Sequence, residues 1–291
     1  MKFTKKALVA MLTTFVLFVS LFAVSTPTTV HAAKKTKKVT LMVGEELSVF
    51  PIGGTLKKVK SSKKKVCAVK KKSGAAILKA KKAGTAKITL KTTGGKLYYK
   101  VKVIKNPFKV SVSPIKDGNV VAVKNTSSLF INYVTVQLTY CDSMGNPLNQ
   151  TTRSIYYLGK GQTGYDYAVN SGATIDYSKT KYKVVEWKRY PDYKSKSYAS
   201  KVNVNHFKGL NTYGSDVLKF NASTNYSGKG TILVAQDVFV YDKVGNIIQV
   251  ISDVTSLYST KSVYTDDYGT TLRDGWASYR VVSTRVYLQT Y

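Results

Sequence analysis

Lysine is the residue whose number and spacing stand out most in this chain of 291 residues, and its chemistry is the electrostatic attraction of anions. Residues 33–106 contain 22 lysines and two glutamates, so they carry a formal net charge of +20 out of +31 for the whole chain. Such a charge creates a long-range positive field that attracts polyanions and that salt weakens. The lysines predicted to form an anion-binding site are Lys57, Lys58, Lys60, Lys63, Lys64, Lys65, Lys70, Lys71, Lys72, Lys79, Lys81 and Lys82.

These lysines also have a plainer interpretation, because lysine at turns and strand edges keeps a protein soluble and prevents pairing between sheets. Under the binding hypothesis, the partner is an anionic cell-wall polymer, such as a teichoic-acid-like wall phosphate, or a surface glycan. Nucleic acid is the rival polyanion. Residues 33–106 contain no arginine for bidentate base contacts and few aromatic rings for stacking, so we expect no specific nucleic-acid partner.

Tyrosine offers a second chemistry, because sugar rings stack their apolar faces on aromatic side chains. The chain has 22 tyrosines, and four of them lie in polar, loop-like stretches of the second half. The candidates for glycan stacking are Tyr165, Tyr167, Tyr193 and Tyr268. Tyrosines in predicted strands, such as Tyr182 and Tyr279, are better explained by core packing and cross-strand pairing. An alternative function is therefore carbohydrate binding by a Tyr-rich face of the second half.

The residue types that catalysis and metal binding need are sparse. The only adjacent carboxylates of the second half are Asp266 and Asp267, whose side chains would point apart on a strand. No nucleophile-elbow or zinc-protease motif occurs, and His206 is the only histidine beyond residue 32. Cys67 and Cys141 fall in different predicted domains, which favours two buried thiols over a disulfide. The sequence predicts a non-enzymatic protein without a cofactor or metal; an unrecognised hydrolase is the remaining alternative.

The first 32 residues have the pattern of a signal peptide. Three lysines precede an apolar run from residue 7 to residue 24, and Val30-His31-Ala32 provides the small residues of a cleavage site. The apolar run is also about long enough for a retained membrane anchor, which is the alternative. We expect a secreted, extracellular protein with no transmembrane anchor in the mature chain. Because no sorting motif of the L-P-x-T-G kind occurs, attachment to the wall would be non-covalent.

Residues 38–105 form the most strongly patterned stretch. Near its end, Tyr99, Val101 and Val103 alternate with Lys100 and Lys102, which predicts a half-buried strand. Together with Val43-Gly44-Glu45 and Ala83-Gly84-Thr85-Ala86, this order of motifs resembles the bacterial immunoglobulin-like domain of group 2. The resemblance implies a small β-sandwich that serves as a spacer or cell-adhesion module, and it implies no catalytic residues.

The remainder of the chain repeats itself at a period of about 100 residues. The segment LTYCDSMGN (138–146) matches VFVYDKVGN (238–246), and YKVVEWKRY (182–190) matches YRVVSTRVY (279–287). Each copy is predicted to contain a hairpin with an Asp-x-x-Gly-Asn turn. The hairpin resembles the FxLYD family of extracytoplasmic β-sandwich domains, although Cys141 replaces the expected tyrosine in the first copy. This resemblance also implies no known chemistry.

The predicted architecture is all-β, with three small β-sandwich domains in tandem after the signal peptide. The predicted divisions are a signal peptide at 1–32, a Lys-rich immunoglobulin-like domain at 33–106, and sandwich repeats at 107–205 and 206–291. The predicted function is non-catalytic binding or structural display at the cell surface or cell wall.

Overall fold

The computed structural model describes residues 36–52, 54–170, 172, 174–190, 194–258, 263–266 and 269–290. Most of this chain is in β-strands, which confirms the all-β prediction. In the part of the chain that is described, there is no helix with the length and apolar character that a bilayer crossing needs. The predicted signal peptide lies outside the described residues. The chain divides into two compact units, residues 1–107 and residues 108–291.

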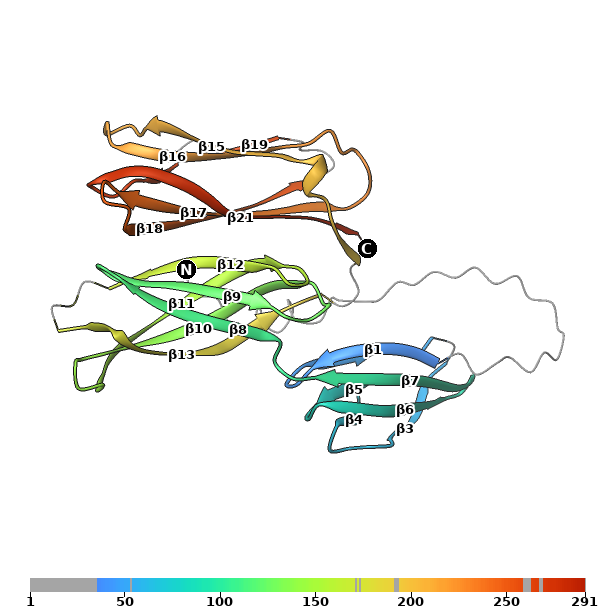
Figure 1. Cartoon of the computed structure of the whole chain (residues 1–291). Coiled ribbons are helices and arrows are strands. Elements are labelled where there is room, and N and C mark those ends of the chain that lie inside the picture. The colour runs from blue at the N-terminus through green and yellow to red at the C-terminus, as the bar shows by residue number, and fades with distance from the viewer. Residues whose placement is uncertain are drawn as a thin grey trace, which may run out of the picture. The chain divides into compact units, whose positions relative to one another are not determined.

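The described residues of the first unit form seven strands in two sheets (Figure 1). One sheet has the strand order β1-β7-β6-β3, and the other has the order β2-β5-β4. The strand bounds are Thr36–Met42 (β1), Glu46–Val49 (β2), Leu56–Ser61 (β3), Cys67–Lys72 (β4), Ala75–Ala80 (β5), Gly84–Thr92 (β6) and Gly95–Ile104 (β7).

The core of the first unit is built by side chains that alternate along these strands. Tyr99, Val101 and Val103 of β7 are buried, whereas Lys100 and Lys102 between them are exposed, as the sequence predicts. The buried residues pack with Ile88 and Leu90 of β6 and with Leu78 and Cys67 of the other sheet. Cys67 has a free, buried thiol, which agrees with the prediction that it acts as a small apolar residue. One face of each sheet therefore forms the core, and the opposite face is available for charged side chains.

The second unit contains two consecutive sets of strands that share a core topology, to which the second set adds β14 and β20. In the first set, the sheets are β11-β10-β13 and β12-β9-β8; in the second, they are β14-β21-β17-β18 and β15-β16-β19, with β20 beside β16. The first-set bounds are Phe108–Ile115 (β8), Gly118–Asn125 (β9), Ile131–Cys141 (β10), Pro147–Leu158 (β11), Thr163–Val169 (β12) and Asp176–Lys188 (β13). The second-set bounds are Lys194–Ser197 (β14), Asn203–Leu210 (β15), Asp216–Ser223 (β16), Thr231–Asp242 (β17), Ile247–Tyr258 (β18), Val263–Thr265 (β19), Thr270–Thr271 (β20) and Trp276–Thr290 (β21).

The matching hairpins have the turn chemistry that the sequence predicts. In the β10–β11 turn, Asp142 Oδ1 accepts hydrogen bonds from the backbone nitrogens of Met144 and Asn146, each at 2.9 Å. Asp242 does the same in the β17–β18 turn, at 3.0 and 2.8 Å. The glycine of each turn has a positive φ, and both hairpins have a bulge at the same position of the repeat. The two hairpins are thus copies in structure as well as in sequence.

The change from the first set to the second occurs earlier than residue 205. Strand β14 pairs with β21, and β15 pairs with β16, so both belong to the sheets of the second set. In the structure the second half of this unit therefore starts by residue 194. The two halves lie one above the other in Figure 1, with β12 beside the sheet that contains β17, β18 and β21.

A joint of apolar side chains connects the two halves. Val120 and Tyr167 from the first half pack with Val250 from the second. Tyr165 meets Phe239 edge to face, with ring centroids 5.1 Å apart. This contact covers the outer face of the β17 sheet, which explains why β17 is buried on both sides through most of its length.

A buried ion pair lies in the same joint. The side chains of Arg285 on β21 and Asp237 on β17 are both 0% exposed and are hydrogen-bonded, with Arg285 Nη2 3.0 Å from Asp237 Oδ1. The first half completes the pair: Arg285 Nε donates to the Tyr156 carbonyl at 2.9 Å, and the Tyr165 backbone nitrogen donates to Asp237 Oδ2 at 2.8 Å. Separation of the halves would therefore deprive both charged groups of their backbone partners from the first half.

We expect Arg285→Ala to lower the free energy of unfolding of the second unit by about 3–5 kcal/mol, because it leaves the carboxylate of Asp237 buried and unpaired. Urea-induced unfolding, followed by tryptophan fluorescence, measures this loss. The matched control is Arg280→Ala, an exposed arginine on the same strand, with an expected cost of about 1 kcal/mol or less. Equal losses for the two variants would show that the ion pair does not hold the joint.

Candidate functional site

All of the lysines predicted to bind anions are exposed, but they do not form one patch. Lys57, Lys58 and Lys60 lie on β3, and Lys63–Lys65 form the turn after it. Lys70–Lys72 end β4 and Lys79 lies on β5, both in the other sheet; Lys81 and Lys82 follow β5. The turn at 63–66 and the loop at 81–82 meet, because the Lys81 backbone nitrogen donates to the Val66 carbonyl at 2.8 Å.

Both glutamates of the first unit are engaged away from most of these lysines. Glu46 Oε1 lies 2.8 Å from Lys79 Nζ in an exposed ion pair. The hydrogen bond from Lys79 lowers the pKa of Glu46, desolvation opposes that shift, and the charges of Lys79, Lys70 and Lys72 add to it. Glu45 Oε2 accepts a hydrogen bond from the Met42 backbone nitrogen at 2.8 Å. The positive charge of the unit is therefore largely uncompensated.

Strand pairing gathers further lysines on the outer face of the β1-β7-β6-β3 sheet. The side chains that alternate with the buried residues on these four strands are lysines, threonines and one tyrosine at most positions, and none of the described ones is acidic. We call this surface the lysine face. Its lysines are Lys38, Lys58, Lys60, Lys87, Lys91, Lys96, Lys100 and Lys102.

The register places lysines directly opposite one another in two rows. In one row, Lys100 of β7 is paired with Lys38 of β1 on one side and with Lys87 of β6 on the other. The second row consists of Lys96, Lys91 and Lys58, on β7, β6 and β3. Like charges in directly opposite positions destabilise a sheet. Folding alone therefore does not favour this arrangement.

Threonine and tyrosine hydroxyls separate the lysine rows. Between the two rows, Tyr98 is paired with Thr36 and Thr89 across the sheet. Beyond the first row, Lys102 is flanked by Thr40 and Thr85. The face thus presents positive charges interspersed with neutral hydroxyl groups, which suits an anion with several acceptor oxygens.

Sequence reasoning predicted two members of the lysine face, Lys58 and Lys60, and missed the others. The predicted lysines are close together in the sequence, whereas residues such as Lys87 and Lys100 are single lysines separated by apolar residues. The available signal was the alternation in residues 86–91 and 99–103. That alternation predicts charged faces on two strands, but only the pairing register shows that the faces coincide.

The predicted glycan-stacking tyrosines have other positions. Tyr167 is buried in the joint, where its hydroxyl accepts a hydrogen bond from Arg273 Nη1 at 2.6 Å. Tyr165 is half-buried against Phe239 in the same joint. Tyr193 and Tyr268 lie outside the described residues. A stacking platform needs an open ring face, and the rings of Tyr165 and Tyr167 are used instead for packing between the halves.

The titratable groups considered for catalysis are distributed over different parts of the second unit. His206 Nε2 lies 2.7 Å from Asp253 Oδ2 between two sheets of the second half, and its side chain is fully buried. Glu186 accepts a hydrogen bond from the Tyr133 hydroxyl at 2.6 Å on the β10 sheet. Among the residues that are described, no group of three histidine, cysteine or acidic side chains could hold a metal ion.

Asp166 is the most perturbed of these acids. Burial raises the pKa of its carboxyl to about 6, and the nearby Asp237 contributes in the same direction. The hydrogen bond from the Tyr167 backbone nitrogen, at 2.6 Å, and the charge of Arg153 oppose the shift. Asp166 lies on β12, next to the joint. We therefore expect the protonation state of its carboxyl to affect the stability of the second unit.

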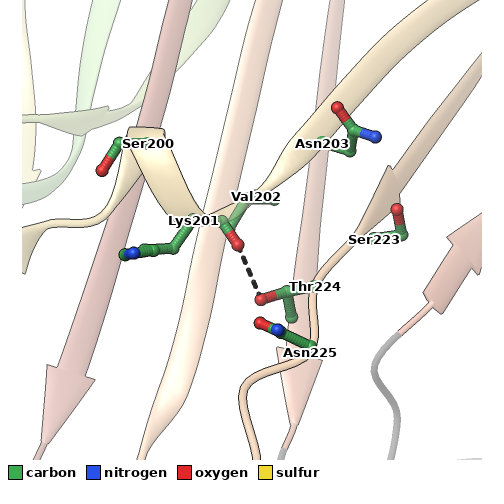
Figure 2. Close-up of a pocket in the computed structure, with 7 residues that line it drawn as sticks. All are labelled: Ser200, Lys201, Val202, Asn203, Ser223, Thr224 and Asn225. Carbon is green, nitrogen blue, oxygen red and sulfur yellow. Dashed lines mark hydrogen bonds between the residues drawn. The ribbon is translucent and has the colours of Figure 1, made fainter.

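A polar hollow of ≈ 490 Å³ lies where β15 begins and β16 ends. It is lined mainly by hydroxyl and amide side chains, and the Thr224 hydroxyl donates to the Lys201 carbonyl at 2.8 Å. Figure 2 shows that the side chains do not converge: Ser200 and Lys201 point to one side, and Asn203 and Ser223 lie on the other. The hollow offers polar groups without a common focus for a ligand.

A scan of the sequence against protein-family models gives no match, and a search of curated proteins finds no relative. The resemblances to the bacterial immunoglobulin-like and FxLYD families therefore remain predictions that depend on their motifs.

We expect Lys100→Thr to stabilise the first unit by about 0.2–1 kcal/mol, because Lys100 is paired with a lysine on each side. The gain should shrink at high salt, which screens the repulsion. Lys102→Thr is the matched control, since Lys102 lies on the same strand and face between two threonines. Urea-induced unfolding in low and high salt compares the two; equal effects would contradict the proposed repulsion.

We expect the stability of the second unit to decrease from pH 4 to pH 7 because of Asp166. Its pKa is raised from 3.8 to about 6 in the folded state, so between these values the folded chain retains a proton that the unfolded chain has released. By linkage the decrease approaches about 3 kcal/mol. Asp166→Asn should remove this contribution and raise the stability at pH 7.

Asp176→Asn is the control for that measurement. Asp176 is an acid whose pKa is lowered, chiefly by hydrogen bonding to Ser178, so its contribution to stability has the opposite sign. Urea-induced unfolding at pH 4, 5, 6 and 7 compares both variants with the unmodified chain. If the pH profile of the Asp166→Asn variant is unchanged, Asp166 does not carry the proton.

Proposed function

We propose that this protein is a secreted, non-catalytic binding or structural protein of the cell surface or cell wall, and that its first unit associates with anionic polymers of the envelope. The observation that carries this proposal is the lysine face. Its outward side chains include eight lysines and no described acid, and both glutamates of the unit are engaged elsewhere. A large polyanion is the partner that such a charged surface fits best.

Solubility and edge protection account less well for these lysines. Edge protection requires charge on edge strands, which in this sheet are β1 and β3. Lys87, Lys91, Lys100 and Lys102 instead lie on the central strands β6 and β7. Solubility requires net charge, but it does not require lysines opposite one another, where they repel. An anionic partner would convert this repulsion into attraction.

The second unit fits a role in spacing or display. The joint combines apolar packing with a buried ion pair, so it favours one arrangement of the two halves over free movement. The resemblance of residues 38–105 to a spacer and adhesion module supports the same interpretation. In this proposal the first unit attaches to the envelope, and the second unit acts as a rigid spacer.

The proposal predicts salt-dependent retention of the full chain on anionic polymer. We expect the chain to bind beads that carry poly(glycerol phosphate) at about 50 mM salt and to be released by about 0.5 M salt, because salt screens the charges. Beads that carry neutral dextran are the control and should retain none. The measurement is the bound fraction across the salt series. Absence of retention on the anionic beads at low salt would refute the proposed function.

A further inference from the structure

We propose that the lysine face is the contact site, and that its ligand is a flexible, linear polymer of phosphate diesters that lies across the strands along the lysine rows. This inference rests on the proposed function, because it assumes that the first unit binds a polyanion. It goes further in assigning the contact to one face of one sheet and in specifying the backbone chemistry of the ligand.

The geometry of the sheet gives the rows their spacing. Neighbouring strands lie about 4.8 Å apart, so Lys38, Lys100 and Lys87 form a row about 10 Å long. The second row is four residues away along β7, or about 13 Å. A chain that crosses the strands can therefore meet three ammonium groups in succession. Long, flexible lysine side chains can adjust to phosphates whose spacing differs from that of the strands.

The composition of the face favours phosphate over other anions and flexible chains over rigid ones. Lysine binds phosphate as a point charge, and the hydroxyls of Thr85 and Thr89 between the lysines can donate to phosphate oxygens. Arginine, which recognises carboxylates and base edges in bidentate fashion, is absent from residues 33–106. A rigid duplex would expose only one side of its cylinder to the sheet, whereas a flexible chain can follow a whole row.

The remaining lysines of the unit are less suited to continuous contact. Lys79 already forms an ion pair with Glu46. Lys70 and Lys72 lie near the same carboxylate, which weakens the field on that face. Lys63–Lys65 lie on a turn and have no cross-strand row. These lysines contribute to the long-range attraction, but the lysine face provides the surface on which a polymer can lie.

The test compares two triple variants of the full chain that lose the same charge. One carries Lys38→Thr, Lys87→Thr and Lys100→Thr, which removes a row of the lysine face. The other carries Lys70→Thr, Lys71→Thr and Lys72→Thr, on strand β4 of the opposite sheet. Binding to poly(glycerol phosphate) is measured at about 50 mM salt, with polyglutamate and double-stranded DNA as additional probes. Urea-induced unfolding checks that both variants are folded.

We expect the row variant to bind poly(glycerol phosphate) at least about tenfold more weakly than the unmodified chain, because it loses three close contacts. The β4 variant should lose less than about threefold. Equal losses would overturn the assignment of the face while leaving the proposed function intact, whereas no binding by the unmodified chain would refute the proposed function itself. Equal or tighter binding of polyglutamate or duplex DNA would overturn the preference for a flexible phosphate polymer.

Discussion

The alternation of side chains along a β-strand is the constraint from which both the core and the candidate site follow. In β7, Tyr99, Val101 and Val103 can be buried only if the residues between them point outward. The residues between them are Lys100 and Lys102, and β1, β6 and β3 follow the same pattern. A change of register by one residue would bury the lysines and expose the valines, so the apolar core fixes the register that aligns the charges.

This constraint explains which features the sequence predicts and which it does not. The all-β class, the alternation in residues 99–103 and the two Asp-x-x-Gly-Asn turns depend on local patterns, and the structure agrees with them. The lysine face depends on which strands are neighbours, and that information is not local. The parallel pairing of β1 with β7 places Lys38 beside Lys100, which is more than 60 residues away in the sequence. Clusters in the sequence consequently identified only part of the site.

The positions of Tyr165 and Tyr167 were missed for a related reason. Polar neighbours such as Asp166 and Gly164 suggested an exposed loop, but each of them has a role in the joint region. Gly164 lies so close to Arg285 that an added Cβ would be 3.0 Å from its Cζ and 2.4 Å from Ile155 Cγ2. Asp166 lies near Asp237 across the joint. A single copy of the repeat cannot reveal that its polar residues face a second copy.

The outer faces of the matching sheets differ in composition between the two copies. The residues that form the second half's side of the joint have polar counterparts in the first half. Where the second copy has Asp237 and Phe239 on β17, the first copy has Gln137 and Thr139 on β10, and Lys188 corresponds to Arg285. The corresponding face of the β10 sheet is hydrogen-bonded within itself, as Thr135 is to Ser154 at 2.8 Å. The buried ion pair and the Tyr165–Phe239 contact therefore depend on residues that the second copy carries and the first copy lacks. Under the proposed function, binding is assigned to the lysine face of the first unit, and the joined halves of the second unit serve for spacing or display.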